Sequence, residues 1–142
     1  MAKILFILND PPYGSERNYN ALRLANSLSK REGESVKIFL FGDAAVCAKG
    51  HQKVPEGYYN LEAMLKASAH HGAEIGVCGS CLDARGIAAT ELTEGAKRRT
   101  LDALGDAGGA SVQRRTAFLE AGRIVEMASV ASEPARCALF VL

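Results

Sequence analysis

Three short apolar runs without polar alternation most constrain what this chain can fold into. They cover residues 4–8, 36–41 and 75–78, and each has the length of a strand. Only Lys37 interrupts the second run. Strands without alternation are buried on both faces, which is typical of parallel sheets covered by helices on both sides. The runs therefore predict a parallel sheet.

Helical segments separate these runs. Residues 16–30 carry apolar side chains at i, i+3, i+4 and i+7, the spacing of one helix face. A second helix is predicted between Asn60, its N-cap, and Gly72, and another over residues 93–104. Alternating strands and helices with right-handed crossovers predict a single three-layer α/β/α domain, flavodoxin-like, with roughly four to five parallel strands.

The last part of the chain, residues 107–142, has an atypical composition rich in Gly, Ala and Arg. Residues 138–142 are apolar and are predicted to supply the last parallel strand. Residues 117–128 fit a helical stripe, although residues 123–130 also fit a strand. We expect a helix before the last strand.

Composition and charge exclude several classes of partner. The chain has 142 residues, 48% of them apolar, and a formal net charge of +1, as expected of one soluble domain. A near-neutral chain has no electrostatic reason to bind nucleic acid or a membrane surface, and the basic runs 97–99 and 114–115 are expected to be solvated. The first apolar run is too short for a signal peptide or a membrane span, so we predict a cytoplasmic protein.

Polar loops follow each predicted strand. The carboxyl ends of parallel strands share one edge of the sheet, and open α/β sheets bind ligands there. Asp43 is also a candidate N-cap for a short Ala-rich stretch at residues 44–48. The predicted substrate or anion pocket comprises Asn9, Tyr13, Gly14, Asp43, Tyr58 and Tyr59.

Cys78 and Cys81 form the most specific motif, two cysteines separated by two residues directly after a predicted strand. A helix N-terminus and a nearby cation lower the pKa of a thiol, and Arg85 could supply that cation. A thiolate attacks the sulfur of a persulfide or disulfide, and a second thiol can resolve the mixed species. We therefore predict that Cys78, Cys81 and Arg85 are catalytic.

Two other uses of the cysteine pair stay open. A thiol–disulfide redox protein would form a reversible disulfide between Cys78 and Cys81. Zinc is a weak alternative because a closed site needs four ligands, and no second pair with this spacing exists. The further ligand candidates are Cys47, His51, His70 and His71. The prediction is no cofactor, with Cys47 and Cys137 packed as small apolar residues.

Several motifs together are similar to one family. They lie at residues 9–14, 16–17, 20–25, 36–43, 57–61 and 78–87. In these motifs, between Lys3 and about Leu104, the chain resembles the DsrE/DsrF-like proteins, small cytoplasmic domains associated with sulfur relay. Residues 107–136 depart from the family pattern, in which a short acidic turn leads to the final strand.

The resemblance implies a flavodoxin-like sheet and assembly into homotrimers or homohexamers. It also implies that the cysteine at the tip of the third strand, here Cys78, carries sulfur as a persulfide. That cysteine precedes an Arg-Gly pair, here Arg85 and Gly86, and the role of Cys81 stays open. The expected function is sulfur relay between donor and acceptor proteins. The alternatives are a metal- or small-anion-binding regulatory module and a thiol–disulfide redox protein.

Overall fold

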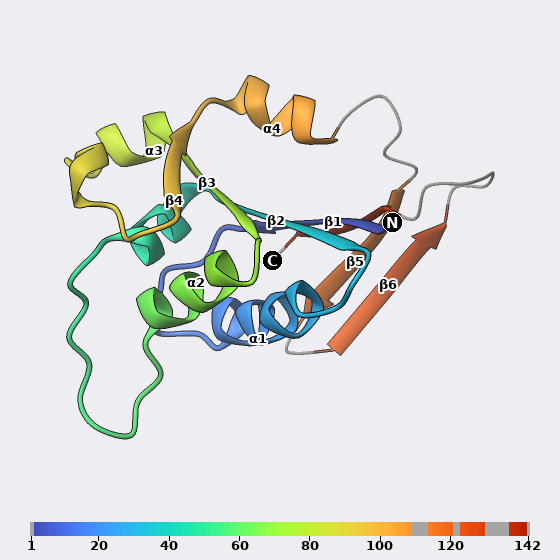
Figure 1. Cartoon of the computed structure of the whole chain (residues 1–142), viewed down its shortest axis with the longest axis horizontal. Helices are drawn as coiled ribbons and strands as arrows, with labels where there is room; N and C mark the ends of the chain where they lie inside the picture. Colours follow the sequence, from blue (N-terminus) through green and yellow to red (C-terminus); the bar gives the residue numbers. More distant parts are fainter. Residues whose placement is uncertain (1, 109–113, 121–122, 130–136, 142) are drawn as a thin grey trace.

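The computed structural model describes residues 2–108, 114–120, 123–129 and 137–141, with side chains between residues 3 and 104 (Figure 1). The three apolar runs form the strands β1 (Ala2–Leu8), β2 (Glu34–Leu40) and β3 (Glu74–Cys78). They pair in parallel, with β2 between β1 and β3. The parallel sheet predicted from these runs is confirmed.

Two helices cover one face of this sheet (Figure 1). They are α1 (Arg17–Ser29) and α2 (Leu61–His70), which pack against each other. Asn60 is the N-cap of α2, because its side-chain Oδ1 accepts a hydrogen bond from the backbone N–H of Ala63 (3.1 Å). Both helices lie where the sequence predicts them.

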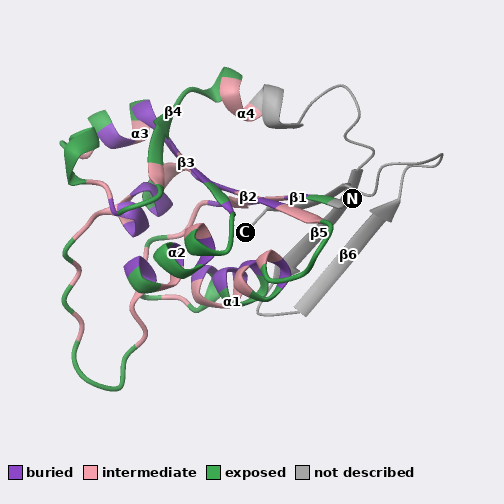
Figure 2. Cartoon of the chain, viewed as in Figure 1, coloured by how far each residue is buried: buried purple, intermediate pink, exposed green. Residues whose placement is uncertain are grey.

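The buried core lies between α1, α2 and the sheet, as the purple segments of Figure 2 show. Every second residue of the strands faces it, which is the strand period. On β1 these residues are Ile4, Phe6 and Leu8, all at most 6% exposed.

Within the described residues, no helix is both long and apolar enough to cross a membrane.

The short helix after β2 corrects one prediction. It is a 3-10 helix, η1 (Gly42–Ala48), and its N-cap residue is Phe41, without a side-chain capping bond. Asp43 therefore does not cap the Ala-rich stretch. Its carboxylate pairs instead with the guanidinium of Arg85.

The predicted helix over residues 93–104 is wrong. After β3 come α3 (Gly79–Asp83), a 3-10 turn η2 (Ala89–Glu91), strand β4 (Ala96–Arg99) and only then α4 (Leu101–Gly108). β4 pairs in parallel with β3 and so satisfies the backbone groups at the outer edge of β3, which a helix would leave open. The basic run at residues 97–99 is thus an edge strand, and α4 lies on the sheet face opposite α1 and α2 (Figure 1).

The final strand is confirmed. It is β7 (Cys137–Val141), which pairs in parallel with β1. The helical stripe predicted over residues 117–128 is wrong, because β5 (Arg114–Glu120) and β6 (Arg123–Ser129) extend the sheet beyond β7 and support the strand alternative. The predictions for the side chains of Cys137 and residues 114–115 lie outside the described side chains.

The described strands form one sheet in the order β4-β3-β2-β1-β7-β5-β6. All neighbours are parallel except β5 and β6, which are antiparallel. The fold is the predicted α/β/α arrangement, with seven described strands in place of the four to five expected. The strands β2, β3 and β4 end on the same edge, where the two cysteines of the motif lie.

Candidate functional site

The cysteine motif lies at the junction of β3 and α3, as predicted. Cys78 ends β3 and is 1% exposed, whereas Cys81 lies in the short helix α3 and is partly exposed. Cys78 Sγ lies 3.2 Å from the hydroxyl oxygen of Ser80. Cys81 Sγ accepts a hydrogen bond from the backbone N–H of Gly42 (3.2 Å). The three cysteines with described side chains, Cys47 included, are free thiols.

The surroundings separate the acidities of these two thiols. Burial opposes the Cys78 thiolate, but hydrogen bonds from the Ser80 hydroxyl, the Cys81 thiol and two backbone N–H groups outweigh it, so the pKa of Cys78 is lowered. Burial raises the pKa of Cys81, and its hydrogen bond to Cys78 raises it further. The pair therefore ionises first at Cys78, which makes Cys78 the stronger candidate nucleophile.

This order of ionisation is testable by alkylation with iodoacetamide. The rate at Cys78 is expected to reach half its maximum below pH 9.0, and the rate at Cys81 above it. Mass spectrometry of the labelled peptides over a pH series measures both midpoints. In Cys78→Ser the midpoint of Cys81 should fall, because the neighbouring sulfur no longer raises it. Reversed midpoints in the wild type would contradict this assignment.

Arg85 contacts Cys81 and favours its thiolate, rather than that of Cys78. Its Nη1 donates to the backbone carbonyl of Cys81 (2.9 Å), and its Nη2 pairs with the carboxylate of Asp43. The positive charge of Arg85 favours the Cys81 thiolate. The sequence therefore identifies a real neighbour of the motif, but the structure places it beside the second thiol.

Arg98 is the cation beside Cys78, and sequence reasoning misses it. Its guanidinium makes two hydrogen bonds to the Asp83 carboxylate, both 2.7 Å. The Asp83 pair and the charge of Cys78 both raise the pKa of Arg98, so guanidinium and thiolate stabilise each other. The basic run 97–99 is the available signal, but by its composition it resembles a solvated face.

The predicted pocket divides into two parts. Near the thiols, the Asn9 carbonyl accepts a hydrogen bond from the backbone N–H of Ala44 (3.3 Å), and Asp43 binds Arg85. Gly42 has a φ of +58°, and a Cβ there would lie 3.7 Å from the Asn9 carbonyl oxygen. The loops after β1 and β2 thus meet beside Cys81, as predicted.

The tyrosines form the other part, where their contacts are with Gln52, with Tyr19 and with one another. The Tyr13 hydroxyl donates to Gln52 Oε1 (2.8 Å), and its ring centroid lies 5.9 Å from that of Tyr59. Tyr59 stacks on Tyr19 at 4.4 Å. Tyr58 is 71% exposed. Gly14, with a φ of +104°, permits the turn between β1 and α1.

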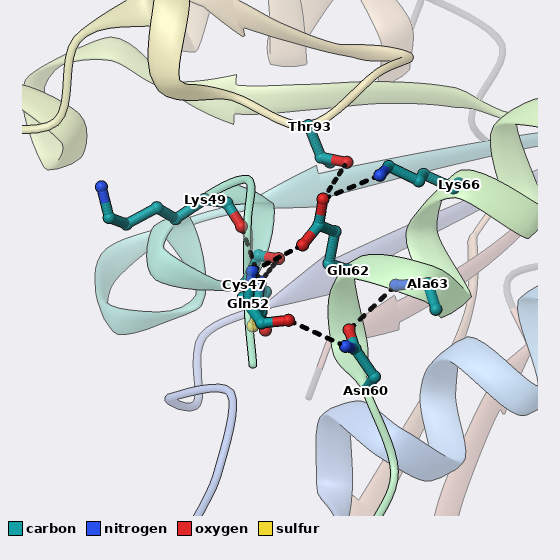
Figure 3. Close-up of polar contacts among 8 residues, drawn as sticks. All are labelled: Cys47, Lys49, Gln52, Asn60, Glu62, Ala63, Lys66 and Thr93. Atoms are coloured by element: carbon teal, nitrogen blue, oxygen red, sulfur yellow. Dashed lines mark hydrogen bonds and ion pairs between the residues drawn. The ribbon is translucent and has the colours of Figure 1, made fainter. Parts of the chain in front are cut away.

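A buried carboxylate that the sequence reasoning did not single out connects the surrounding loops (Figure 3). Glu62 accepts hydrogen bonds from the backbone N–H of Gln52 (2.7 Å) and the hydroxyl of Thr93 (3.3 Å), and it pairs with Lys66 (2.8 Å). The hydrogen bond from Lys66 is the main cause that lowers the pKa of Glu62 to about 2. Glu62 thus ties α2 to the segments that precede it and that lead into β4.

The other cysteine with a described side chain behaves as predicted. Cys47 is fully buried, and burial raises its pKa to about 12, so its thiol stays protonated at neutral pH. Among residues whose side chains the structure describes, no three His, Cys, Asp or Glu residues come together as a metal site.

Comparison with known proteins places this arrangement in a family. A profile of the DsrE/DsrF-like family matches residues 2–119. Protein YchN of Escherichia coli (strain K12) is 37% identical over 102 residues, which cover 71% of this chain and 86% of that protein. The uncharacterized protein MJ0989 of Methanocaldococcus jannaschii is 40% identical over 99 residues, which cover 70% and 85%.

Two solved structures have the same fold as this chain. The crystal structure of the ychN protein from E. coli superposes with a TM-score of 0.75 at 29% identity, over 99% of both chains. MTH1491 from Methanobacterium thermoautotrophicum, described as a protein of unknown function, has the same fold, with a TM-score of 0.59 at 12% identity over 75% of this chain and 90% of that one. The chain therefore belongs to the DsrE/DsrF-like family.

Proposed function

We propose that this chain carries sulfane sulfur as a persulfide on Cys78. The observation that carries the proposal is the position of this thiol at the end of β3, where hydrogen bonds lower its pKa and a pocket adjoins it. A thiolate at neutral pH is the reactive form toward sulfane sulfur. Membership of the DsrE/DsrF-like family supports a role in sulfur relay.

The transfer needs no other reagent. The Cys78 thiolate attacks the outer sulfur of a donor persulfide, a new sulfur–sulfur bond forms on Cys78, and the donor's own sulfur–sulfur bond breaks. The donor leaves as a thiolate. Delivery is the same step with an acceptor thiolate as the nucleophile. Arg85 stabilises the anionic form of Cys81, which we propose assists as the second thiol.

Loading with a low-molecular-weight persulfide, such as cysteine persulfide, tests the proposal. Wild-type protein is expected to gain one sulfur atom on Cys78, visible by mass spectrometry and removed by a reductant. Cys78→Ser should lose this adduct completely, whereas Cys81→Ser should keep it. Cys47 is an internal control, because a buried thiol with a pKa of about 12 should not load. No adduct on wild type, or an undiminished adduct in Cys78→Ser, would exclude the persulfide carrier.

A second candidate is thiol–disulfide exchange, which the hydrogen bond between the Cys78 and Cys81 thiols favours. The two thiols would reduce a small disulfide to two thiols and form an internal disulfide. Titration with glutathione redox buffers measures this. A Cys78–Cys81 pair that stays reduced in oxidised glutathione would exclude the redox function and leave the persulfide carrier standing.

We propose a cytoplasmic protein that assembles into homotrimers or homohexamers and exchanges sulfur with donor and acceptor proteins. Light scattering of the purified chain measures the assembly, and a monomer at micromolar concentration would contradict it.

A further inference from the structure

A pocket beside Cys78 has a chemistry that the persulfide proposal does not use. It has a volume of about 590 Å³ and lies between α3, β4 and the start of α4. Its polar and reactive lining comes from Cys78, Ser80, Arg98, Arg99 and Thr100. Among the described residues that line it there are two arginines and no carboxylate. The pocket is thus lined by both a candidate nucleophile, Cys78, and two positively charged residues, Arg98 and Arg99.

Arg98 can occupy its position because residue 79 is a glycine and has no side chain. A Cβ on Gly79 would lie 2.9 Å from Arg98 Nε and 3.0 Å from its Cζ, so a side chain at this position would push the guanidinium away. The guanidinium therefore lies directly against the backbone that follows Cys78. Its register position, beside Val77 on β3, brings it to the end of that strand.

Asp83 forms an ion pair with Arg98 that a bound anion can replace. The two side chains are 43% and 64% exposed, and exposed ion pairs of this kind are weak. Asp83 uses the Nη1 and Nη2 donors of the guanidinium. Arg98 has a fixed fork of donors that matches oxyanions, so an anion in the pocket can bind to it beside, or in place of, Asp83.

We propose that this pocket binds a small sulfur oxyanion with a transferable outer sulfur, of the thiosulfate type, and that Arg98 recognises its oxyanion end. This inference rests on the proposed persulfide function. A small donor suits the site because Cys78, although only 1% exposed, lines a pocket that such a molecule can enter. The positive charge of Arg98 offsets part of the repulsion between a dianion and the Cys78 thiolate, and Arg99 adds a second cationic residue to the lining.

The reaction balances without another reagent. The Cys78 thiolate attacks the outer sulfur of thiosulfate, and a bond forms between Cys78 Sγ and that sulfur. The sulfur–sulfur bond of thiosulfate breaks, and its electron pair leaves with sulfite. The negative charge of the attacking thiolate ends on the persulfide of Cys78.

Anion recognition is measured separately from sulfur transfer by comparing two alkylating agents. Iodoacetate is anionic and iodoacetamide is neutral, and both react at the same sulfur. In Arg98→Gln the ratio of the iodoacetate rate to the iodoacetamide rate at Cys78 is expected to fall on the order of tenfold, the loss of one charge-assisted contact. Asp83→Asn, which frees the guanidinium, should raise the ratio. Lys97→Gln is the matched control, since Lys97 lies on the same strand but does not line this pocket.

The thiosulfate arm completes the test. Wild-type protein with thiosulfate should gain one sulfur on Cys78 and release one sulfite, and Arg98→Gln should do so about tenfold more slowly. An unchanged alkylation ratio in both Arg98→Gln and Asp83→Asn would overturn the anion pocket, even if cysteine persulfide still loads Cys78. Loading by cysteine persulfide but not by thiosulfate would overturn the oxyanion substrate alone. No loading by either donor would overturn the persulfide function itself.

Discussion

Gly95→Ala is expected to destabilise the chain by about 2–4 kcal/mol, the combined cost of a left-handed backbone and a steric clash. Gly95 has a φ of +86°, and a Cβ at this position would lie 2.5 Å from the Cβ of Ala69 on α2. Neither atom can move without its backbone. Because Gly95 directly precedes β4, this strain would displace the strand that carries Arg98.

A matched glycine separates the two causes. Gly33 has a similar φ of +80°, but a Cβ there would meet no atom within 4 Å, so Gly33→Ala should cost only the conformational part, about 1–2 kcal/mol. Urea unfolding measures both variants. In a double-mutant cycle, Ala69→Gly should recover the steric part of the Gly95→Ala loss. Equal losses of stability in Gly95→Ala and Gly33→Ala would show that the contact with Ala69 does not contribute to the loss.

Glu62→Ala should cost about 2–3 kcal/mol, because it leaves buried donors without an acceptor. The backbone N–H of Gln52 and the hydroxyl of Thr93 both lose their partner, and the ammonium of Lys66 loses its counter-charge. Chemical denaturation measures the loss. Glu74→Gln is the control, since Glu74 belongs to an exposed ion pair with Lys37 and its replacement should change stability by no more than about 0.5 kcal/mol.

The same carboxylate predicts an acid-dependent loss of stability. The pKa of Glu62 is about 2 in the folded chain against an ordinary value of 4.5, so its stabilisation is fully present above pH 4.5. That stabilisation is lost as the pH falls from 4.5 toward 2. Denaturation at several pH values should therefore show a steeper acid loss in wild type than in Glu62→Gln. Parallel curves for the two proteins would show that Glu62 does not titrate in this window.

Much of the central fold follows from local sequence pattern. Uninterrupted apolar runs such as residues 4–8 indicate buried parallel strands because both of their faces must leave water. Asn60 marks the start of α2 because its side chain caps the helix within the same turn. The position of Cys78 at a strand end follows directly from these assignments, since the run that contains it ends there.

The errors lie where pairing with a distant strand outweighs local pattern. Residues 96–99 are mostly charged and resemble a solvated helix face, yet they complete the edge of β3. Residues 117–128 show a helical stripe, yet they lie in β5 and β6. In both cases the backbone hydrogen bonds of a neighbouring strand decide the structure, and no short window of sequence contains them.

A parallel α/β sheet and a thiol pair at the end of its third strand follow from the order of the amino acids alone. Those features depend on apolar runs and on spacing within a single loop. Only the folded chain decides which arginine lies beside which thiol. Arg85 lies with Asp43 beside Cys81, whereas Arg98 lies against Gly79 beside Cys78. The register between β4 and β3 sets the position of Arg98, and that register is formed by hydrogen bonds between strands that no local pattern encodes.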